Sequence, residues 1–422
     1  MVKHEMERET MNEPLALDGS VTIVGASLAG LRCAETLRAQ GFSGTITMIG
    51  EESSTPYDRP PLSKNVLNGK WEIEKVTLAD DAKLDDLRIT TRFGMKAVAL
   101  DAGAHRVVLA DASTLDSDAV VITTGAGLRY LPGTRDLEGV YGLRTDDDAV
   151  NLRRALVALN PASRVVLVGA GFIGQEVATA AAAMNHQVTI LEGLDLPLLP
   201  IVGPHVAELL LTFSASSGVA LRCGVKVTSI EGPRDGALAG WVNIEGADPV
   251  PADLIVVGIG VTPSTAWLED SGLTIENGVV TDRHLFAGPG IVAAGDVARF
   301  HWNDAGHNEL VRIEHWQMAV DQGVHAAKSL LAGPKHAETF AAVPYFWSDQ
   351  WGKKIQVLGH PSADDDVSLA IVPDEEGRFL AIYHHDDFIT GVLAVSKPRQ
   401  LMAFRPLLVK GSTLSEAKDI AL

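Results

Sequence analysis

The sequence is poor in cysteine: its 422 residues include only Cys33 and Cys223, which lie far apart in the chain. Neither belongs to a C-x-x-C motif, so the sequence predicts neither a redox-active dithiol nor a cysteine-ligated metal site. Both lie in apolar periodic segments, where a thiol acts as a small packing residue. We therefore expect no metal site and no catalytic thiol.

Long apolar runs and positive charge are also scarce. No apolar run approaches the ~18 residues that a membrane-spanning helix needs. The 35 Lys and Arg are outnumbered by 54 Asp and Glu, which gives a formal net charge of −19. This charge argues against nucleic acid or a membrane surface as a partner, and it leaves room for a local basic patch. Residues 1–19 mix both charges without an apolar stretch, which predicts a mobile tail and not a secretory signal, and the expected location is the cytoplasm.

What the sequence does contain is typical of a globular protein with several domains. Its hydrophobic fraction of 46% supports packed cores, and its length predicts two or three domains. Two β-α-β patterns indicate parallel strands joined by right-handed crossovers. The first places strands at Val21–Val24 and Thr45–Ile49 around a helical pattern. The second places strands at Arg164–Val168 and Gln187–Glu192 around a helix at Gln175–Ala183.

The second pattern contains a complete G-x-G-x-x-G, formed by Gly169, Gly171 and Gly174. Glycine permits a tight turn and lets the backbone approach a pyrophosphate at the helix N-terminus. Glu192, about 20 residues further on, is the acid expected to bind the ribose hydroxyls. Its charge would repel the additional phosphate of NADPH, and no arginine follows closely, so the pattern favours NADH. The alternative is an ordinary turn whose glycines serve packing.

The first pattern contains a related but altered loop, GASLAG, at residues 25–30. Gly25 and Gly30 keep the outer glycine positions, and Ser27 replaces the middle glycine. Serine is small enough for a pyrophosphate to approach, and its hydroxyl could donate a hydrogen bond. Glu51, or its neighbour Glu52, ends the second strand and would bind a ribose. The loop predicts a second nucleotide site.

Further segments together resemble one family. They are PYDRPPLSK at 56–64, GAGFIGQE at 169–176, DLIVVGIGVTPST at 253–265, AAGD at 293–296, RIEHW at 312–316 and FWSDQ at 346–350. With GASLAG before them, they resemble the FAD-dependent NADH:ferredoxin reductases of oxygenase systems. Putidaredoxin reductase, rubredoxin reductase and the biphenyl dioxygenase ferredoxin reductase belong to this family. The resemblance extends from about Val21 into the C-terminal part.

The resemblance implies an α/β fold with two Rossmann-like dinucleotide-binding domains, arranged as in glutathione reductase, and a small C-terminal α+β domain. The implied parts are a tail (1–19), a discontinuous FAD-binding domain (20–128 and 261–335), an NADH-binding domain (129–260) and the C-terminal domain (336–422). Alternating strands and turns after about Tyr345 agree with a small α+β module.

The resemblance also implies the roles of individual residues. Lys64 would reach the flavin, where a cation stabilises negative charge, and Asp296 would bind the ribityl chain. Trp316 would lie against the flavin ring, and Glu176 near the nicotinamide carboxamide. The FAD set is Gly25, Ser27, Ala29, Gly30, Glu51, Arg59, Lys64, Val98 (or Ala97), Arg144, Asp296 and Trp316, and the NADH set is Gly169, Gly171, Gly174 and Glu192. Lys64, Glu176 and Trp316 are the candidate catalytic residues.

Each of these assignments has a simpler alternative. Lys64 could be a surface lysine that caps a turn, and Asp296 could be a helix N-cap. Trp316 could be an ordinary core residue and Glu176 a solvated helix residue. Arg144 could pair with the acidic residues 146–148 on the surface.

Some features depart from the family or fall outside the predicted sites. The segment His284–Gly290 lacks the threonine–serine–aspartate turn usual in the family, and Pro200 stands where relatives often have arginine. His384–Asp387 contains metal-ligand residue types, but it lies on a predicted turn where adjacent side chains diverge. We interpret it as a solvated hairpin tip.

These observations imply a reaction. Hydride transfer supplies two electrons, an iron–sulfur cluster accepts one at a time, and flavin can connect the two. The resemblance implies electron transfer from NADH through FAD to a [2Fe–2S] ferredoxin that feeds an oxygenase, with a rubredoxin as second choice. Relatives that use a dithiol or one reactive cysteine are disfavoured by the positions of Cys33 and Cys223. An NADH-sensing flavoprotein similar to apoptosis-inducing factor, and a structural flavoprotein without turnover, stay as alternatives. Lys397, Arg399 and Arg405 are the predicted docking patch for an acidic partner.

Overall fold

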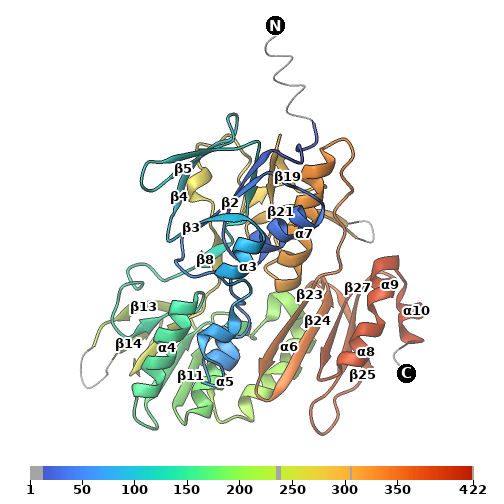
Figure 1. Cartoon of the computed structure of the whole chain (residues 1–422). Coiled ribbons are helices and arrows are strands. Elements are labelled where there is room, and N and C mark those ends of the chain that lie inside the picture. The colour runs from blue at the N-terminus through green and yellow to red at the C-terminus, as the bar shows by residue number, and fades with distance from the viewer. Residues whose placement is uncertain (1–12, 234–238, 305–306, 421–422) are drawn as a thin grey trace. The chain divides into compact units, whose positions relative to one another are not determined.

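The structure is a computed structural model that describes residues 13–233, 239–304 and 307–420 (Figure 1). The chain divides into two compact units, each assembled from separate segments. The first unit comprises Met1–Asp58, Thr77–Gly127 and Thr262–Pro344. The second unit comprises Arg59–Val76, Leu128–Val261 and Tyr345–Leu422. In the described ranges, no helix combines the length and apolar character that crossing a bilayer requires.

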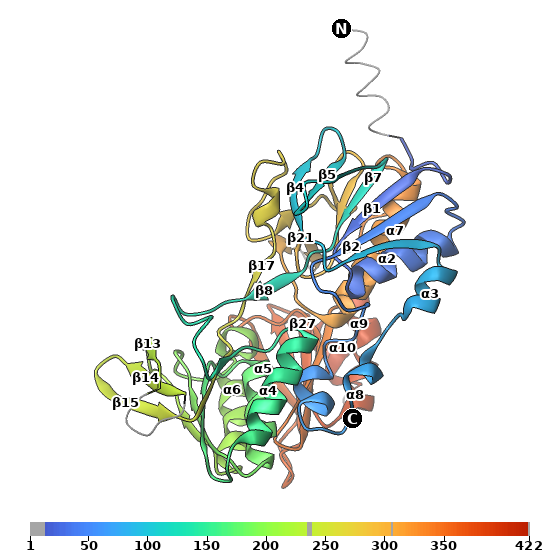
Figure 2. The ribbon, with the colours of Figure 1, turned by 60° about the vertical axis from the view of Figure 1, so that its left-hand side comes forward.

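The first unit is built on a six-stranded sheet with strand order β19-β20-β7-β1-β2-β3. Its strands are β1 (Ser20–Val24), β2 (Thr45–Gly50), β3 (Ile89–Phe93), β7 (Ala119–Ile122), β19 (Phe286–Gly288) and β20 (Ile291–Ala293). Strand β1 pairs in parallel with both β2 and β7. Helices α2 (Leu28–Ala39) and α7 (Trp316–Ala332) lie side by side against this sheet (Figures 1 and 2). The apolar strands therefore form the core of a sheet that is parallel except at its edge, where β19 pairs antiparallel with β20.

Smaller elements complete the first unit. They are α3 (Asp81–Asp86), β4 (Ala97–Asp101), β5 (Arg106–Leu109), β6 (Thr114–Asp116), the 3-10 helix η3 (Ala266–Leu268), β18 (Val279–Val280), β21 (Ala298–Asp304) and β22 (His307–Val311). Strands β8 (Ala126–Leu128) and β17 (Val261–Pro263) pair with each other at the two points where the chain changes unit.

The second unit contains a five-stranded parallel sheet with strand order β12-β11-β10-β16-β9. These strands are β9 (Val140–Tyr141), β10 (Arg164–Val168), β11 (Gln187–Leu191), β12 (Ala220–Arg222) and β16 (Leu254–Val257). The helices of this part are α4 (Asp146–Ala158), α5 (Phe172–Ala183) and α6 (Leu199–Ala215), together with the π-helix η1 (Leu62–Val66) and the 3-10 helix η2 (Ile73–Val76). A three-stranded sheet, β13 (Val227–Glu231), β14 (Gly240–Ile244) and β15 (Ala247–Ala252), protrudes from this unit (Figure 2).

The C-terminal part of the second unit is an antiparallel sheet with strand order β23-β24-β27-β26-β25 and three short helices. Its elements are β23 (Tyr345–Gln350), β24 (Lys353–Gly359), β25 (Asp366–Ile371), β26 (Leu380–His385), β27 (Phe388–Val395), α8 (Pro398–Ala403), α9 (Arg405–Lys410) and α10 (Leu414–Lys418). The buried side chains of α6 share one apolar core with this sheet. We call this part the C-terminal module.

The α/β fold class predicted from the sequence is confirmed, and several element boundaries are corrected. Helix α5 begins at Phe172, because Gly171 is extended (φ −66°, ψ 177°) and serves as its N-cap. Helix α7 begins at Trp316, directly after the extended residue His315. The apolar segment after Asp253 forms β16 and then the separate strand β17.

The predicted tail needs a further correction. Residues 1–12 lie outside the described residues. Residues 13–19 are ordered against the first unit, where the Leu15 N–H donates to the Leu330 carbonyl at 2.9 Å. The Leu15 side chain packs against the core beneath α7, so burial of an apolar side chain fixes a segment that its charge pattern had assigned to the tail.

Candidate cofactor sites

The G-x-G-x-x-G loop of the second unit joins β10 to α5. A Cβ on Gly169 (φ +105°) would lie 2.3 Å from the Gly258 carbonyl oxygen, and one on Gly174 would lie 2.3 Å from the Gly169 oxygen. A Cβ on Gly171 would meet nothing within 4 Å. The outer glycines are thus required by packing, whereas the middle glycine leaves open space at a helix N-terminus. A loop of this construction can hold a pyrophosphate at the helix N-terminus.

Glu192 follows β11 and faces this loop. Its Oε2 accepts a hydrogen bond from the Ala170 N–H at 2.7 Å, and its Oε1 accepts one from the Leu194 N–H at 2.9 Å. Two backbone donors therefore hold the carboxylate beside the loop at the end of the second strand. A carboxylate at this position can accept hydrogen bonds from ribose hydroxyls. Pro200, the departure from the family, lies exposed in the first turn of α6.

The GASLAG loop of the first unit has the same construction. A Cβ on Gly25 (φ +119°) would lie 2.1 Å from the Thr123 carbonyl oxygen, and one on Gly30 would lie 2.2 Å from the Gly25 oxygen. Ser27 is the N-cap of α2, the position that Gly171 occupies in the other unit, and its side chain makes no capping hydrogen bond. Its hydroxyl is therefore available to a phosphate. Ala29 is buried in the first turn of α2.

Asp296 lies in a turn directly after β20, and two side chains fix this turn. The Gln322 Oε1 on α7 accepts from the Gly295 N–H at 2.8 Å, and the Arg312 guanidinium donates to the Asp296 carbonyl at 3.1 Å. The chain continues into strand β21, so the alternative that Asp296 caps a helix is wrong. The parallel strands β20, β7 and β1 are neighbours, which brings this turn to the same sheet edge as the GASLAG loop.

The other first-unit candidates lie on separate elements. Glu51 is 67% exposed and pairs with Lys96 at 2.9 Å, while its neighbour Glu52 accepts a hydrogen bond from Tyr57. Val98 is 43% exposed at a register shift of β4, where a bulge frees backbone groups from the ladder. The Trp316 indole N–H donates to Asp58 at 2.6 Å, which holds the ring at the start of α7.

Lys64 and Glu176 form a buried ion pair in the second unit. The Lys64 Nζ lies 2.8 Å from Glu176 Oε2, and the two side chains are 15% and 2% exposed. Ser63 also donates to Oε2, and Oε1 accepts from the Ser348 hydroxyl at 2.6 Å and the Asp349 N–H at 3.1 Å. The alternatives of a surface lysine and a solvated glutamate are therefore wrong. A buried carboxylate needs such donors to stay charged.

Arg59 and Arg144 lie together in the second unit. The Arg59 guanidinium donates to the Arg144 carbonyl at 2.6 Å. The Asp148 carboxylate accepts from the Arg144 and Thr145 N–H groups at 2.9 and 2.8 Å and completes a capping box at the start of α4. Asp148 therefore caps the helix through backbone contacts, and these contacts tie the segment that carries Arg144 to the start of α4.

The structure also adds residues that the sequence analysis missed. Ser63 and Ser348 bind the Glu176 carboxylate, and Gln322 and Arg312 hold the Gly295–Asp296 turn. Ser63 lies within the PYDRPPLSK segment, Ser348 within FWSDQ and Arg312 within RIEHW. These three motifs draw attention to Ser63, Ser348 and Arg312. Because the residues that they contact are distant in sequence, the motifs alone do not indicate what these three side chains bind.

Neither thiol is suited to redox chemistry. Burial raises the pKa of Cys33 to about 12. Burial also raises the pKa of Cys223, with a further contribution from the negative charges of Glu192 and Asp195. Both thiols therefore stay protonated at neutral pH, and a protonated thiol is a poor nucleophile.

Two other polar regions contain none of the predicted cofactor residues. Asp386 and Asp387 form the turn between β26 and β27, and His384 Nδ1 contacts the Asp386 carbonyl. Among the described residues, no three His, Cys, Asp or Glu side chains are grouped to hold a metal ion.

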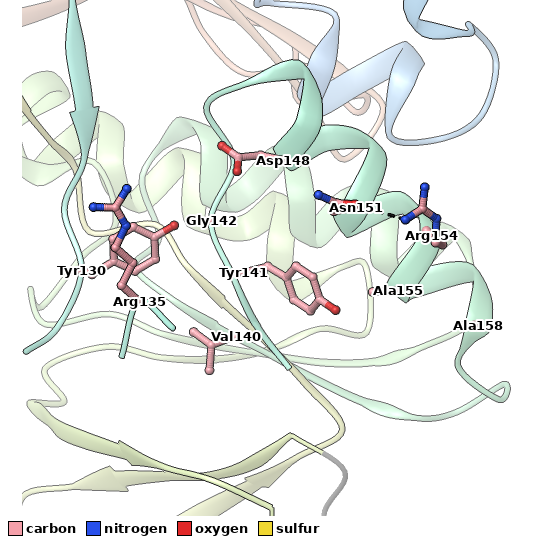
Figure 3. Close-up of a pocket in the computed structure, with 10 residues that line it drawn as sticks. All are labelled: Tyr130, Arg135, Val140, Tyr141, Gly142, Asp148, Asn151, Arg154, Ala155 and Ala158. Atoms are coloured by element: carbon pink, nitrogen blue, oxygen red, sulfur yellow. Dashed lines mark hydrogen bonds between the residues drawn. The ribbon is translucent and has the colours of Figure 1, made fainter. Parts of the chain in front are cut away.

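A groove of about 490 Å³ runs between β9 and α4 and is lined by Tyr130, Tyr141, Asp148, Asn151, Arg135 and Arg154, among others (Figure 3).

Comparison with known proteins identifies the family. The model described as pyridine nucleotide-disulphide oxidoreductase matches residues 19–323, and that described as reductase C-terminal matches residues 345–421. The chain belongs to the pyridine nucleotide-disulphide oxidoreductase family. It is an oxidoreductase whose cofactors are FAD and NAD(H), and both glycine cradles fit these dinucleotides.

Individual relatives cover nearly the whole chain. Rhodocoxin reductase of Rhodococcus erythropolis is 37% identical over 391 residues, which cover 92% of this chain and 89% of the relative. A ferredoxin–NAD(P)⁺ reductase of a Sphingomonas species is 33% identical over 403 residues, 95% of this chain and 93% of the relative. A chain in the crystal structure of the covalent putidaredoxin reductase–putidaredoxin complex matches with a TM-score of 0.86 at 31% identity, over 93% of each chain.

The open space at Gly171 yields a prediction. Gly171→Ala is expected to leave the thermal unfolding midpoint unchanged, because φ is −66° and the added methyl meets no protein atom. If this loop binds NADH, as the sequence predicts, the variant should weaken NADH binding about tenfold, equal to ~1.4 kcal/mol, because the methyl enters the cradle. Gly174→Ala is the matched contrast, since its methyl would clash with the Gly169 carbonyl and lower the unfolding midpoint. Titration calorimetry and thermal unfolding measure both quantities; unchanged NADH affinity in Gly171→Ala would contradict this assignment.

Proposed function

We propose that this chain is an FAD-dependent NADH:ferredoxin reductase that supplies electrons to an oxygenase through a [2Fe–2S] ferredoxin. The observation that carries the proposal is the combination of two dinucleotide cradles with a buried Lys64–Glu176 pair and two unreactive thiols. The chain then has no dithiol that could accept the electrons of NADH. These electrons must therefore pass to another electron carrier. The related proteins are named for rhodocoxin, ferredoxin and putidaredoxin.

In this proposal residues 20–128 and 261–335 bind FAD, and residues 129–260 bind NADH. Bound FAD supplies the ability to accept an electron pair and release single electrons. Ser27 and Asp296 hold the FAD phosphates and ribityl chain, and Glu51 and the Val98 backbone hold its adenosine. Arg59, Arg144, Lys64 and Trp316 are the remaining FAD contacts that we assign.

For NADH, the 169–174 cradle binds the pyrophosphate, Glu192 binds the adenosine ribose and Glu176 lies near the nicotinamide. Hydride transfer itself requires no side chain to remove a proton, so we assign no general base. The candidate catalytic residues act by position and charge, with Lys64 supplying the cation near the flavin. The proposed location is the cytoplasm.

Anaerobic rapid mixing tests this function. The purified holoprotein should lose its flavin absorbance on mixing with NADH and should then reduce added [2Fe–2S] ferredoxin in a coupled cytochrome assay. Yellow protein that does not bleach with NADH would refute the proposal. Slow bleaching with a persistent charge-transfer band and no ferredoxin reduction would instead support an NADH sensor. Faster turnover with a rubredoxin than with any ferredoxin would reassign the partner.

The docking patch provides a further prediction. Lys397, Arg399 and Arg405 lie at α8 and α9, and none of them forms an ion pair with another described residue. Changing all three to glutamine should raise the KM for an acidic ferredoxin about tenfold at low salt, or ~0.5 kcal/mol for each charge, and flatten its dependence on ionic strength. NADH-driven flavin bleaching should not change. Lys226→Gln, which changes an exposed lysine directly before β13 in the same unit, is the control. A triple variant with unaltered salt dependence would place docking elsewhere.

A further inference from the structure

One face of α5 is covered by the first hairpin of the C-terminal module. The rings of Phe172 and Phe346 meet edge to face with centroids 4.8 Å apart. The Trp351 indole donates to the Gln175 side chain at 3.0 Å, and the Trp351 N–H donates to the Thr179 hydroxyl at 3.2 Å. These positions on α5 are three or four residues apart, so they share one helical face. The helix that begins at the NADH cradle is therefore held by the C-terminal module within one compact unit.

Glu176 lies on this face, between the hairpin and η1. Its carboxylate accepts from Ser63 and Lys64 on η1 and from Ser348 and the Asp349 N–H on β23. Ser348 is fully buried, and its oxygen accepts from the Gln350 amide at 3.1 Å. Because the carboxylate that pairs with Lys64 can only accept, the Ser348 hydroxyl donates its proton to Glu176 Oε1.

These donors leave part of the Lys64 ammonium group unused. The ammonium has three N–H donors. One is directed to Glu176 and one to the Pro60 carbonyl at 3.2 Å, and no other described residue accepts from it. If Ser348 did not satisfy Oε1, the carboxylate would carry more uncompensated charge beside the ammonium. The field that Lys64 can exert on a neighbouring ligand would then be weaker.

We propose that Ser348 is a positioning residue through which the C-terminal module tunes the flavin. By donating to Glu176, it limits the negative charge beside Lys64 and leaves one Lys64 N–H for the flavin. This inference rests on the proposed function, because it takes the flavin as the neighbour of Lys64. It gives the FWSDQ segment a part in the redox site.

The test compares holoprotein variants by the flavin midpoint potential, measured by dye-equilibrated reduction. Ser348→Ala should keep FAD and shift the oxidised-to-reduced equilibrium about tenfold toward oxidised flavin, or ~30 mV more negative for a two-electron couple. Ser348→Thr, which keeps the hydroxyl, should restore the wild-type potential. Ser214→Ala is the control, because Ser214 is a buried serine of the same unit whose hydroxyl, among the described residues, donates to the Leu211 carbonyl alone.

A purely structural role would lower the unfolding midpoint of Ser348→Ala without moving the potential, and that result would overturn the proposal. If Ser348→Ala does not retain FAD, Ser63→Ala provides the same measurement from the other carboxylate oxygen. An unchanged flavin midpoint potential in Ser63→Ala would also overturn the proposal. A wild-type flavin that NADH does not reduce would refute the proposed function instead, independently of either serine.

Discussion

Asp296→Ala is expected to purify with little FAD and so to be nearly colourless. The Asp296 carboxylate lies in a turn that Gln322 and Arg312 fix from two sides, at the sheet edge shared with the GASLAG loop. A hydrogen bond from a ribityl hydroxyl to a charged carboxylate is worth about 1.5–3 kcal/mol, so its loss should weaken FAD binding roughly 10- to 100-fold. The flavin-to-protein absorbance ratio and a fluorescence titration of the apoprotein with FAD measure this effect.

Two further variants make this test specific. Asp296→Asn keeps the shape and one acceptor oxygen, so it should lose less FAD affinity than the alanine variant. Asp111→Asn changes an exposed carboxylate in the turn between β5 and β6 and should retain a full complement of FAD. Stoichiometric FAD in Asp296→Ala, with native affinity, would remove Asp296 from the cofactor site.

Neutralising Glu192 is expected to produce the other large effect, a loss of discrimination between NADH and NADPH. At ~4 Å and an effective dielectric constant of ~20, two unit charges repel by about 4 kcal/mol. Half of this value after screening, ~2 kcal/mol, corresponds to roughly 30-fold in binding. The carboxylate is fixed by the Ala170 and Leu194 N–H groups, so it cannot easily swing away from an additional phosphate.

Steady-state kcat/KM values for both nucleotides test this prediction. Glu192→Ser removes both the negative charge and the hydrogen bonds to the loop. It should lower the ratio of kcat/KM for NADH to kcat/KM for NADPH by more than tenfold, because the Coulomb repulsion of the additional phosphate is lost. Glu192→Gln keeps an acceptor for one of the N–H groups and isolates the contribution of charge. Glu245→Gln, at an exposed carboxylate of the same unit, should leave the ratio unchanged. An unaltered ratio in both Glu192 variants would exclude this residue from the ribose site.

Much of the cofactor architecture could be predicted because it is encoded in short segments. Gly169, Gly171 and Gly174 lie within one loop, and strand, loop and helix follow one another directly. The spacing of the three glycines can be recognised within this one segment, although the Gly258 carbonyl that Gly169 packs against is distant in the chain. The domain boundaries stay predictions, because the compact units describe packing and not which cofactor each segment binds.

The sequence by itself therefore determined the two nucleotide cradles, the acid that follows each second strand and the absence of a dithiol. Only the tertiary structure decided that Glu176 is buried and which groups bind it, since Lys64 and Ser348 are 112 and 172 residues away in the chain. Helical periodicity could not predict the burial of Glu176. On an Ala-rich helix a glutamate can either face solvent or be buried against hydrogen-bond donors. Long-range packing of η1 and β23 onto α5 supplied those donors, and a carboxylate is stably buried only where donors meet it.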